Sequence, residues 1–270
     1  VTFTRRASAE MSTRLGAMVG TAVAARVMCG TFHSIARTLL RAQDGTQRVI
    51  SEHAQQAVFS EQAYARGYRN RRVATTLLSS AYDARAMTYP REYTYCALQK
   101  HGMGWEIPAH AVRDIFNHFD AYKRKYGLVE FSDLIRWWVD YVPVHDVDAA
   151  PKHMLVDEMQ DCNTPQHEIV ARYMQQHGTR VFGVGDDAQC IYEWRGSCPS
   201  MMRAMYVRLG AVAGGCHQLD VNYRSTPSIV SFCDALLALS PDPVLRGAVR
   251  AASCDDEAPG GVPSLFAYMS

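Results

Sequence analysis

The sequence predicts an α/β fold with a parallel sheet, because two short apolar runs flank a well-marked helix. Residues 154–156 and 181–184 have the length and the apolar side chains of buried strands. Between them, Asn163-Thr164-Pro165 is a helix start signal with Pro at the first helical position, and Gly178 ends the helix. A strand, a helix and a second strand in this order are typical of parallel sheets.

Polar residues follow both apolar runs. Asp157 and Glu158 come directly after the first, and residues 185–187 and Gln189 follow the second. Ligands bind beyond the carboxyl ends of strands in such sheets. An acidic pair there suits nucleotide hydrolysis, in which one carboxylate holds Mg²⁺ and its neighbour orients or deprotonates the attacking water. The alternative is that Asp157 and Glu158 are only polar residues that close a strand.

Two strand-to-helix turns are predicted before this region. Residues 1–4 alternate like a strand end and lead into a helix with apolar residues at 7, 11 and 15. Residues 27–29 predict a short strand, and a helix with an apolar face follows the turn at 30–34. Backbone N–H groups at such turns can hold phosphate, although an ordinary βα turn is the favoured explanation when a turn is taken alone. Thr31-Phe32-His33 could hold a nucleic-acid phosphate and stack on a base.

The segment 44–127 has helical character and is interpreted as an insert between strands of the main sheet. It contains a run of tyrosines and arginines at 64–72 and the basic triplet 123–125. Basic residues interleaved with tyrosines suit a groove for single-stranded nucleic acid. The alternative is a solvated helix face, which is the more common role of a charge run.

The remaining elements follow in order. Residues 131–138 predict a helix that packs through its tryptophans, and 144–152 a polar linker. Beyond the second polar tip, Met201, Met205 and Leu209 indicate a core-facing helix, and 218–221 a strand. Thr226-Pro227 starts a further helix. Its expected buried face comprises Ile229, Phe232, Cys233, Leu236 and Leu237. Residues 240–261 predict a loop and 262–269 a last strand.

Composition restricts the class of protein. The net charge of +1 provides no general attraction to nucleic acid, so such binding would use local patches. The eight cysteines contain no C-x-x-C pair, which disfavours a zinc site and favours a reducing, intracellular compartment. No apolar run reaches the length of a membrane span, and no signal peptide is visible. Because the first residue is Val, the chain is expected to be a fragment cut at its amino end.

Five sequence blocks occur in one order: VTFTRRASAEM, GTFHSIARTLLR, LVDEMQD, VGDDAQCIYEWRG and LDVNYRST. In this ordered set the chain resembles the UvrD/Rep/PcrA family of superfamily 1 DNA helicases, over nearly its whole length. The resemblance implies two RecA-like α/β cores with ATP between them. Residues 1–43 and 128–215 would form the first core, 44–127 a helical insertion, and 216–270 the start of the second core.

The resemblance also implies roles for individual residues. Asp157 would hold Mg²⁺, Glu158 would activate the water, and Gln189 would contact the terminal phosphate of ATP. Tyr223 would stack on the adenine, and Arg224 would act as an arginine finger. The residues expected to bind single-stranded DNA are Phe3, Thr4, Arg5, Thr31, Phe32, His33, Tyr192, Trp194 and Arg195.

The implied activity is that of an ATP-dependent helicase or translocase. It would move 3′ to 5′ on single-stranded DNA in replication or repair, with duplex junctions as a further partner. Ala188, Cys190 and Glu193 replace the family's usual Asp, Ser and Gly, and Glu193 brings a negative charge near the expected DNA path.

The phosphate-binding motif G-x-x-x-x-G-K-[ST] is absent, since none of the four lysines follows a glycine. An alternative is therefore a non-hydrolysing module that binds single-stranded DNA or a partner. A third possibility is the motor part of a helicase–nuclease.

Overall fold

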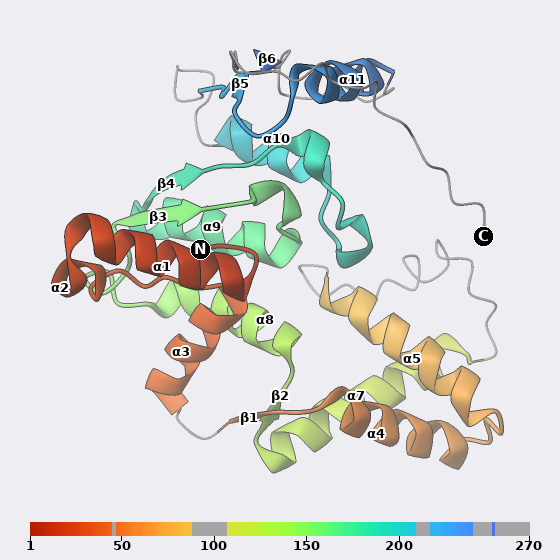
Figure 1. The fold of residues 1–270 in the computed structure, drawn as a ribbon. Helices are drawn as coiled ribbons and strands as arrows, with labels where there is room; N and C mark the ends of the chain where they lie inside the picture. The colour runs from red at the N-terminus through yellow and green to blue at the C-terminus, as the bar shows by residue number, and fades with distance from the viewer. Residues whose placement is uncertain (45–46, 88–106, 209–216, 240–249, 252–270) are drawn as a thin grey trace.

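A computed structural model describes residues 1–44, 47–87, 107–208, 217–239 and 250–251, and shows a mixed α/β chain that is mostly helical (Figure 1). The described helices are α1 (Arg5–Val19), α2 (Thr21–Ala24), α3 (Phe32–Asp44), α4 (Glu52–Ala65), α5 (Arg71–Ala86), α7 (Ala109–Tyr126), α8 (Phe131–Tyr141), α9 (Thr164–His177), α10 (Pro199–Arg208) and α11 (Pro227–Ala238). The described strands are β1 (Arg48–Val49), β2 (Leu128–Val129), β3 (His153–Val156), β4 (Arg180–Gly183), β5 (Val221–Asn222) and β6 (Arg250–Ala251). Within these ranges, no helix has the length and apolarity to cross a lipid bilayer.

The main sheet is parallel, as the sequence predicts. β3 and β4 pair in register from His153 opposite Arg180 to Val156 opposite Gly183. On the other side of β3, the amide N of Asp157 donates to the carbonyl O of Val1 at 3.0 Å. Thr2 in turn forms a parallel bridge with Thr31. Four chain segments therefore lie side by side in the order β4, β3, residues 1–2 and residues 30–31.

The predicted strand at 27–29 is wrong in its position. Those residues carry no strand hydrogen bonds, and the pairing begins one residue later, where the amide N of Thr2 donates to Gly30 O at 3.0 Å. Gly30 is buried, and a Cβ there would lie 2.5 Å from Ser34 Oγ, so α3 begins immediately after the bridge. The bridge is too short to leave an apolar run in the sequence.

One hydrophobic core lies under one face of the main sheet, between β3 and the helices α3, α8 and α9. Met154 and Val156 point into this core, whereas Leu155 is exposed, which is the alternation expected of a strand. α9 begins and ends as predicted. Asn163 and Gln166 form a reciprocal capping box, and Gly178 adopts φ +62° at the end of the helix.

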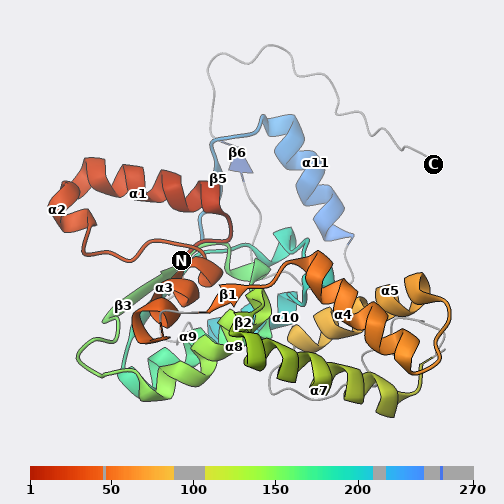
Figure 2. The same cartoon turned by 90° about the horizontal axis from the view of Figure 1, so that it is seen from below.

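A second core holds α4, α5 and α7 together, around Phe59, Tyr82, Phe116 and Phe119. The prediction of helices in this segment is confirmed for its described residues. The prediction missed the parallel pair β1–β2, in which Arg48 lies opposite Leu128. Each of these strands has two residues, too few for a periodic pattern. Figure 2 shows the three helices beside one another, with β1 and β2 leading back to α8.

A buried ion network joins this helical unit to the main core. Lys123 of α7 is only 4% exposed, and its Nζ lies 2.9 Å from Glu130 Oε2 and 2.5 Å from Asp133 Oδ2. Glu130 and Asp133 form the capping box that starts α8. Lys123 Nζ also donates to Tyr82 Oη of α5 at 2.8 Å. Burial and the Glu130 carboxylate raise the pKa of Tyr82, so the phenol stays protonated.

The helix predicted after residue 4 is confirmed as α1, on which Ala7, Met11 and Leu15 are half-buried. Three expectations near the carboxyl end of the chain need correction. In α11 the one buried residue is Val230, whereas Ile229, Phe232 and Leu236 are exposed. The strand predicted at 218–221 begins only at Val221, and the loop predicted at 240–261 contains β6. Leu209 and the strand predicted at 262–269 lie outside the described residues.

Replacing Lys123 with Met should destabilise the protein by about 3–5 kcal/mol, because the change leaves the half-buried carboxylates of Glu130 and Asp133 without their buried cation. The free energy of unfolding, measured by urea denaturation, checks this. Arg124→Met is the matched control, since the neighbouring Arg124 is exposed. Equal losses in the two variants would contradict a special role for the buried lysine.

Candidate functional site

The acidic pair lies at the carboxyl end of β3, where the sequence places it. Asp157 is half-buried and Glu158 is exposed. Glu158 adopts φ 52° and ψ 50°, and it is the one non-glycine residue with positive φ among the described residues. Such a conformation costs about 1–2 kcal/mol in a residue with a Cβ. It turns the chain sharply, so that the next residues lie under the neighbouring tip.

Gln160 ties the two polar tips together, although the sequence pattern does not single it out. Its side chain is 2% exposed. Gln160 Nε2 donates to Glu158 Oε2 at 2.8 Å, and Gln160 Oε1 accepts from the amide N of Asp186 at 3.1 Å. A Cβ on Gly185 would lie 2.6 Å from Gln160 Oε1 and 3.1 Å from the amide N of Met159, so a larger residue there would displace the Gln160 side chain from its present position. The one signal in the sequence is a neutral amide inside an otherwise acidic motif.

The polar residues of the second tip, which follows β4, differ in their surroundings: Asp187 is buried, whereas Gln189 is exposed. Asp187 is buried and accepts from Arg203 Nε of α10 at 3.2 Å. Asp186 caps the short 3-10 helix Asp187–Gln189 by accepting from the amide N of Ala188. Gln189 is exposed, and its Nε2 donates to Asp186 Oδ2 at 2.8 Å. The Asp186 carboxylate therefore orients the side-chain amide of Gln189, which is exposed and accessible to a ligand.

The carboxylates of the first tip have unused acceptor capacity. Among the described residues, none donates a hydrogen bond to the Asp157 carboxylate, and Asp161 Oδ1 is buried without a partner. Burial and the nearby Glu158 raise the pKa of Asp161 to about 6. The described residues include no group of three or more His, Cys, Asp and Glu arranged to hold a metal. This donor set fits Mg²⁺ that arrives with a nucleotide, because Mg²⁺ then needs only one or two carboxylates.

An aromatic cluster forms beside these tips, from two distant parts of the chain. The rings of Phe3 and Tyr192 have centroids 4.8 Å apart, and those of Tyr192 and Trp194 are 6.2 Å apart. Trp194 is 68% exposed. The guanidinium of Arg195 lies 4.6 Å from the centroid of the Trp194 ring. We call these four residues the aromatic tip. A ring surface with an adjacent guanidinium suits stacked bases and a phosphate.

His33 joins a third segment to the aromatic tip. Burial and the positive charge of Arg195 lower the pKa of His33 to about 4. Its ring stands edge-on to Phe131, with centroids 5.8 Å apart. At neutral pH His33 is therefore uncharged, and it offers a ring and hydrogen bonds instead of a cation.

The other residues expected to contact DNA mostly start helices. Thr4 Oγ1 accepts from the amide N of Ala7 and caps α1, whereas Arg5 is exposed at the first position of that helix. Thr31 is buried, and its Oγ1 accepts from the amide N of Ser34 in α3. Phe32 is 4% exposed and packs on Trp138 in the main core. The expected contact of Phe32 with a base is not supported, because a buried ring has no face free for stacking.

Tyr223 and Arg224 lie on a different element. They follow β5, which pairs with β6 and sits with α11 above β4 and α10 in the view of Figure 1. Tyr223 is 85% exposed, and the amide N of Arg224 donates to Asn222 Oδ1 at 2.8 Å. In the described part of the chain, neither side chain bonds to Asp157, Glu158 or Gln189. The structure thus brings together the tips that follow β3 and β4, but does not bring residues 223–224 to them.

The helical unit of α4, α5 and α7 contacts the residue that follows the aromatic tip in the sequence. Gly196, directly after Arg195, adopts φ +81°, and a Cβ there would lie 2.8 Å from the Cβ of Met87 at the end of α5. Glycine is thus required at position 196 for both its backbone conformation and its space. The three helices α4, α5 and α7 are anchored at this second point as well as through Lys123.

Asp161→Asn should stabilise the protein more at pH 7 than at pH 4. The folded state raises the pKa of Asp161 from 3.8 to about 6, so between these values the folded protein binds the extra proton. Stability of the parent therefore falls as pH rises through this window, and the full penalty is present above pH 6. Asn carries no such penalty. Urea denaturation of both proteins from pH 4 to pH 7 checks this, and a constant difference would contradict it.

Comparison with known proteins gives one family and several of its members. The family model for the UvrD/REP helicase N-terminal domain matches residues 1–209. The chain is 27% identical over 253 residues to ATP-dependent DNA helicase Rep of Salmonella typhimurium, covering 89% of this chain and 36% of the relative. It is 29% identical over 247 residues to DNA helicase II of Escherichia coli, covering 88% and 33%. ATP-dependent DNA helicase UvrD2 of Mycobacterium tuberculosis is 27% identical over 292 residues, covering 99% and 40%. The chain thus spans about a third of the length of these curated relatives.

Proposed function

Because the chain belongs to the UvrD/REP helicase family, we propose that it supplies ATP-hydrolysing and DNA-gripping surfaces of a helicase or translocase that moves 3′ to 5′ on single-stranded DNA. The observation that supports this most is the parallel pairing of β4, β3, residues 1–2 and residues 30–31. It directs three groups to one sheet edge: Asp157 and Glu158 (the acidic tip), residues 185–189 (the amide tip) and the aromatic tip. The proposed setting is DNA replication or repair, with duplex junctions as a further partner.

In this proposal the acidic tip binds the Mg²⁺ of the nucleotide and promotes its hydrolysis. Asp157 holds Mg²⁺ on the phosphates of ATP, and Glu158 orients or deprotonates the attacking water. Gln160 is a positioning residue, since its amide fixes one Glu158 oxygen at 2.8 Å. Gln189 contacts the terminal phosphate region. Because Gln160 also holds the backbone of Asp186, a shift of Glu158 on hydrolysis is transmitted directly to the second tip.

The aromatic tip then holds single-stranded DNA. Trp194 and Tyr192 stack on successive bases, and Arg195 contacts a phosphate. Stacking of this kind contributes about 1–3 kcal/mol per base. Phe3 supports Tyr192 from the side, and neutral His33 completes the surface. Thr4, Arg5 and Thr31 present or shape the adjoining helix starts, which suit backbone phosphates.

The second nucleotide-binding surface comes from the segment after residue 216. We place residues 1–43 and 128–215 in a first RecA-like core, 44–127 in an inserted helical subdomain, and 216–270 at the start of a second core. Closure of the second core on ATP would bring Tyr223 to the adenine and Arg224 to the γ-phosphate. The proposal requires a phosphate-binding loop from outside these 270 residues, since none of the four lysines here follows a glycine.

A non-hydrolysing module that binds single-stranded DNA is the second candidate. The missing phosphate-binding lysine favours it. The hydrogen bonds that join Glu158 to the amide tip favour hydrolysis instead, because simple DNA binding gives no reason to couple these tips.

Glu158→Gln in the intact protein should reduce ATP turnover by about 10²–10⁴-fold while ATP binding persists, because the variant loses the base but keeps the shape of the side chain. Steady-state hydrolysis and binding of a fluorescent ATP analogue check the two halves. Glu10→Gln, on the exposed face of α1, is the control and should leave turnover unchanged. Unchanged hydrolysis in Glu158→Gln would refute the assigned role.

Trp194→Ala should weaken binding of an oligothymidine by about 1–3 kcal/mol, because one stacking surface is removed. Filter binding with and without ATP measures the effect. Tyr126→Ala removes an exposed ring from the end of α7 and should change nothing. If ATP leaves the affinity of the parent unaltered while Trp194→Ala abolishes binding, the non-hydrolysing module is the better description.

A further inference from the structure

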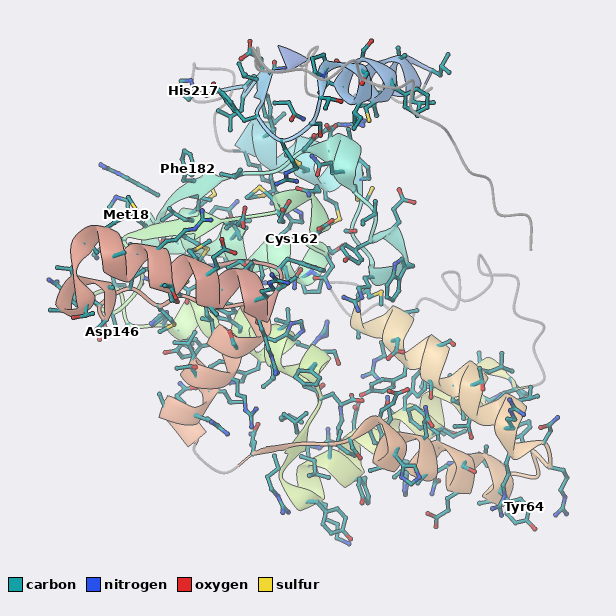
Figure 3. The ribbon with its side chains drawn as sticks, viewed as in Figure 1. Met18, Tyr64, Asp146, Cys162, Phe182 and His217 are labelled. Carbon is teal, nitrogen blue, oxygen red and sulfur yellow. The ribbon has the colours of Figure 1, made fainter. Side chains whose placement is uncertain are left out.

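We propose that Glu193 makes the aromatic tip selective among bases. Its carboxylate accepts a hydrogen bond from the exocyclic amino group of a base held at the tip, and thereby favours cytosine over thymine. The inference rests on the proposed binding of single-stranded DNA at the aromatic tip and adds a base preference to it. Figure 3 shows the loop of residues 190–196 standing out from the end of the main sheet, on the side of the labelled Cys162 that faces away from Met18.

Glu193 stands in the sequence between the two rings that would stack on bases. It is exposed, and it begins the 3-10 helix that carries the tip. The rings of its neighbours, Tyr192 and Trp194, have centroids 6.2 Å apart. The amide N of Gly196 donates to the carbonyl O of Glu193 at 2.8 Å and closes the turn. The backbone of Glu193 is thus fixed next to both stacking surfaces.

The carboxylate of Glu193 has no partner within the described part of the chain. No hydrogen bond or ion pair reaches it from any described residue. The cation two residues further on, Arg195, lies against the rings instead. Its guanidinium is 4.6 Å from the centroid of Trp194 and 5.4 Å from that of Tyr192. Both oxygens of Glu193 are therefore available to accept hydrogen bonds from a ligand.

The turn itself makes no use of this carboxylate. Glu193 does not have a positive φ, since Glu158 is the one non-glycine residue in the described ranges that does. The backbone thus accommodates any side chain at this position, where the family usually has Gly. A negative charge beside phosphates lowers the affinity for DNA, because like charges repel. A contact with bases gives the carboxylate a role that neither the fold nor the phosphates provide.

The chemistry of a carboxylate decides which bases it prefers. When ionised it accepts hydrogen bonds and donates none. It cannot bond to a phosphate oxygen, but it can accept from the N4 amino group of cytosine. Thymine has the O4 oxygen at the same place, and its N3–H donor lies between two carbonyl oxygens that repel an anion. Since every base offers a face for stacking, the difference between these two pyrimidines falls on the edge contact.

The test compares the intact parent protein with Glu193→Gln, which keeps the shape of the side chain. The Gln amide can donate to thymine O4 as well as accept from cytosine N4, so the variant should lose the preference. Filter binding at neutral pH measures the affinities for oligodeoxycytidine and oligothymidine of equal length. Glu61→Gln, which removes the same charge from an exposed position on α4, is the matched control. Thermal unfolding should be unchanged in both variants, because neither carboxylate has a partner among the described residues.

We expect the parent to bind oligodeoxycytidine about 5–10-fold more tightly than oligothymidine, which is the low end for one base contact because Glu193 is exposed. Glu193→Gln should bring this ratio close to one, whereas Glu61→Gln should leave it unchanged. A parent without a preference, or a preference that persists in Glu193→Gln, would overturn the proposal. An equal change of both affinities in Glu193→Gln would overturn it as well, because Glu193 would then act only as a charge near the phosphates.

The variant Trp194→Ala separates this inference from the proposed function. If it weakens the binding of both probes while the parent shows no preference between them, DNA binds at the aromatic tip and only the role of Glu193 fails. If it weakens the binding of neither probe, the proposed binding of DNA at the tip fails, and the inference that rests on it fails too.

Discussion

The parallel pairing of β4, β3, residues 1–2 and residues 30–31 is the constraint on which the candidate site depends. Parallel segments end at the same edge of a sheet, so stretches far apart in the chain deliver their polar tips to one place. The register also decides which side chains face the core. Val156 is buried and Leu155 is exposed, and a slip of one residue would exchange them and move Asp157 from its present place.

Within that edge, one buried side-chain amide links the two polar tips, which are far apart in the sequence. Gln160 bonds to the Glu158 carboxylate and to the backbone of Asp186, and Asp161 beside it has a pKa raised to about 6. Buried polar groups of this kind fix a geometry strongly when they are satisfied and cost stability when they are not. Gln160 is satisfied and Asp161 Oδ1 is not. The site thus contains both a rigid link and a group whose charge state depends on its surroundings.

The helical unit is attached to the main core at two points of different chemistry. Lys123 joins it through the capping box of α8, and the close approach of Met87 to Gly196 joins it to the aromatic tip.

Local patterns were sufficient to predict the bounds of α9, the parallel order of the central strands and the place of both polar tips. Caps and helical periodicity depend on residues within about four positions of one another, and these are adjacent in the sequence. The exposed face of α11, the burial of Phe32, and the partners of Lys123 and Gln160 could not be predicted in this way. Each of them depends on contacts between residues far apart in the chain: Gln160 meets Asp186, and Lys123 meets Tyr82. Such contacts exist only after the sheet and the helices have packed, and it is packing that makes a polar residue a bridge and an aromatic residue part of the core.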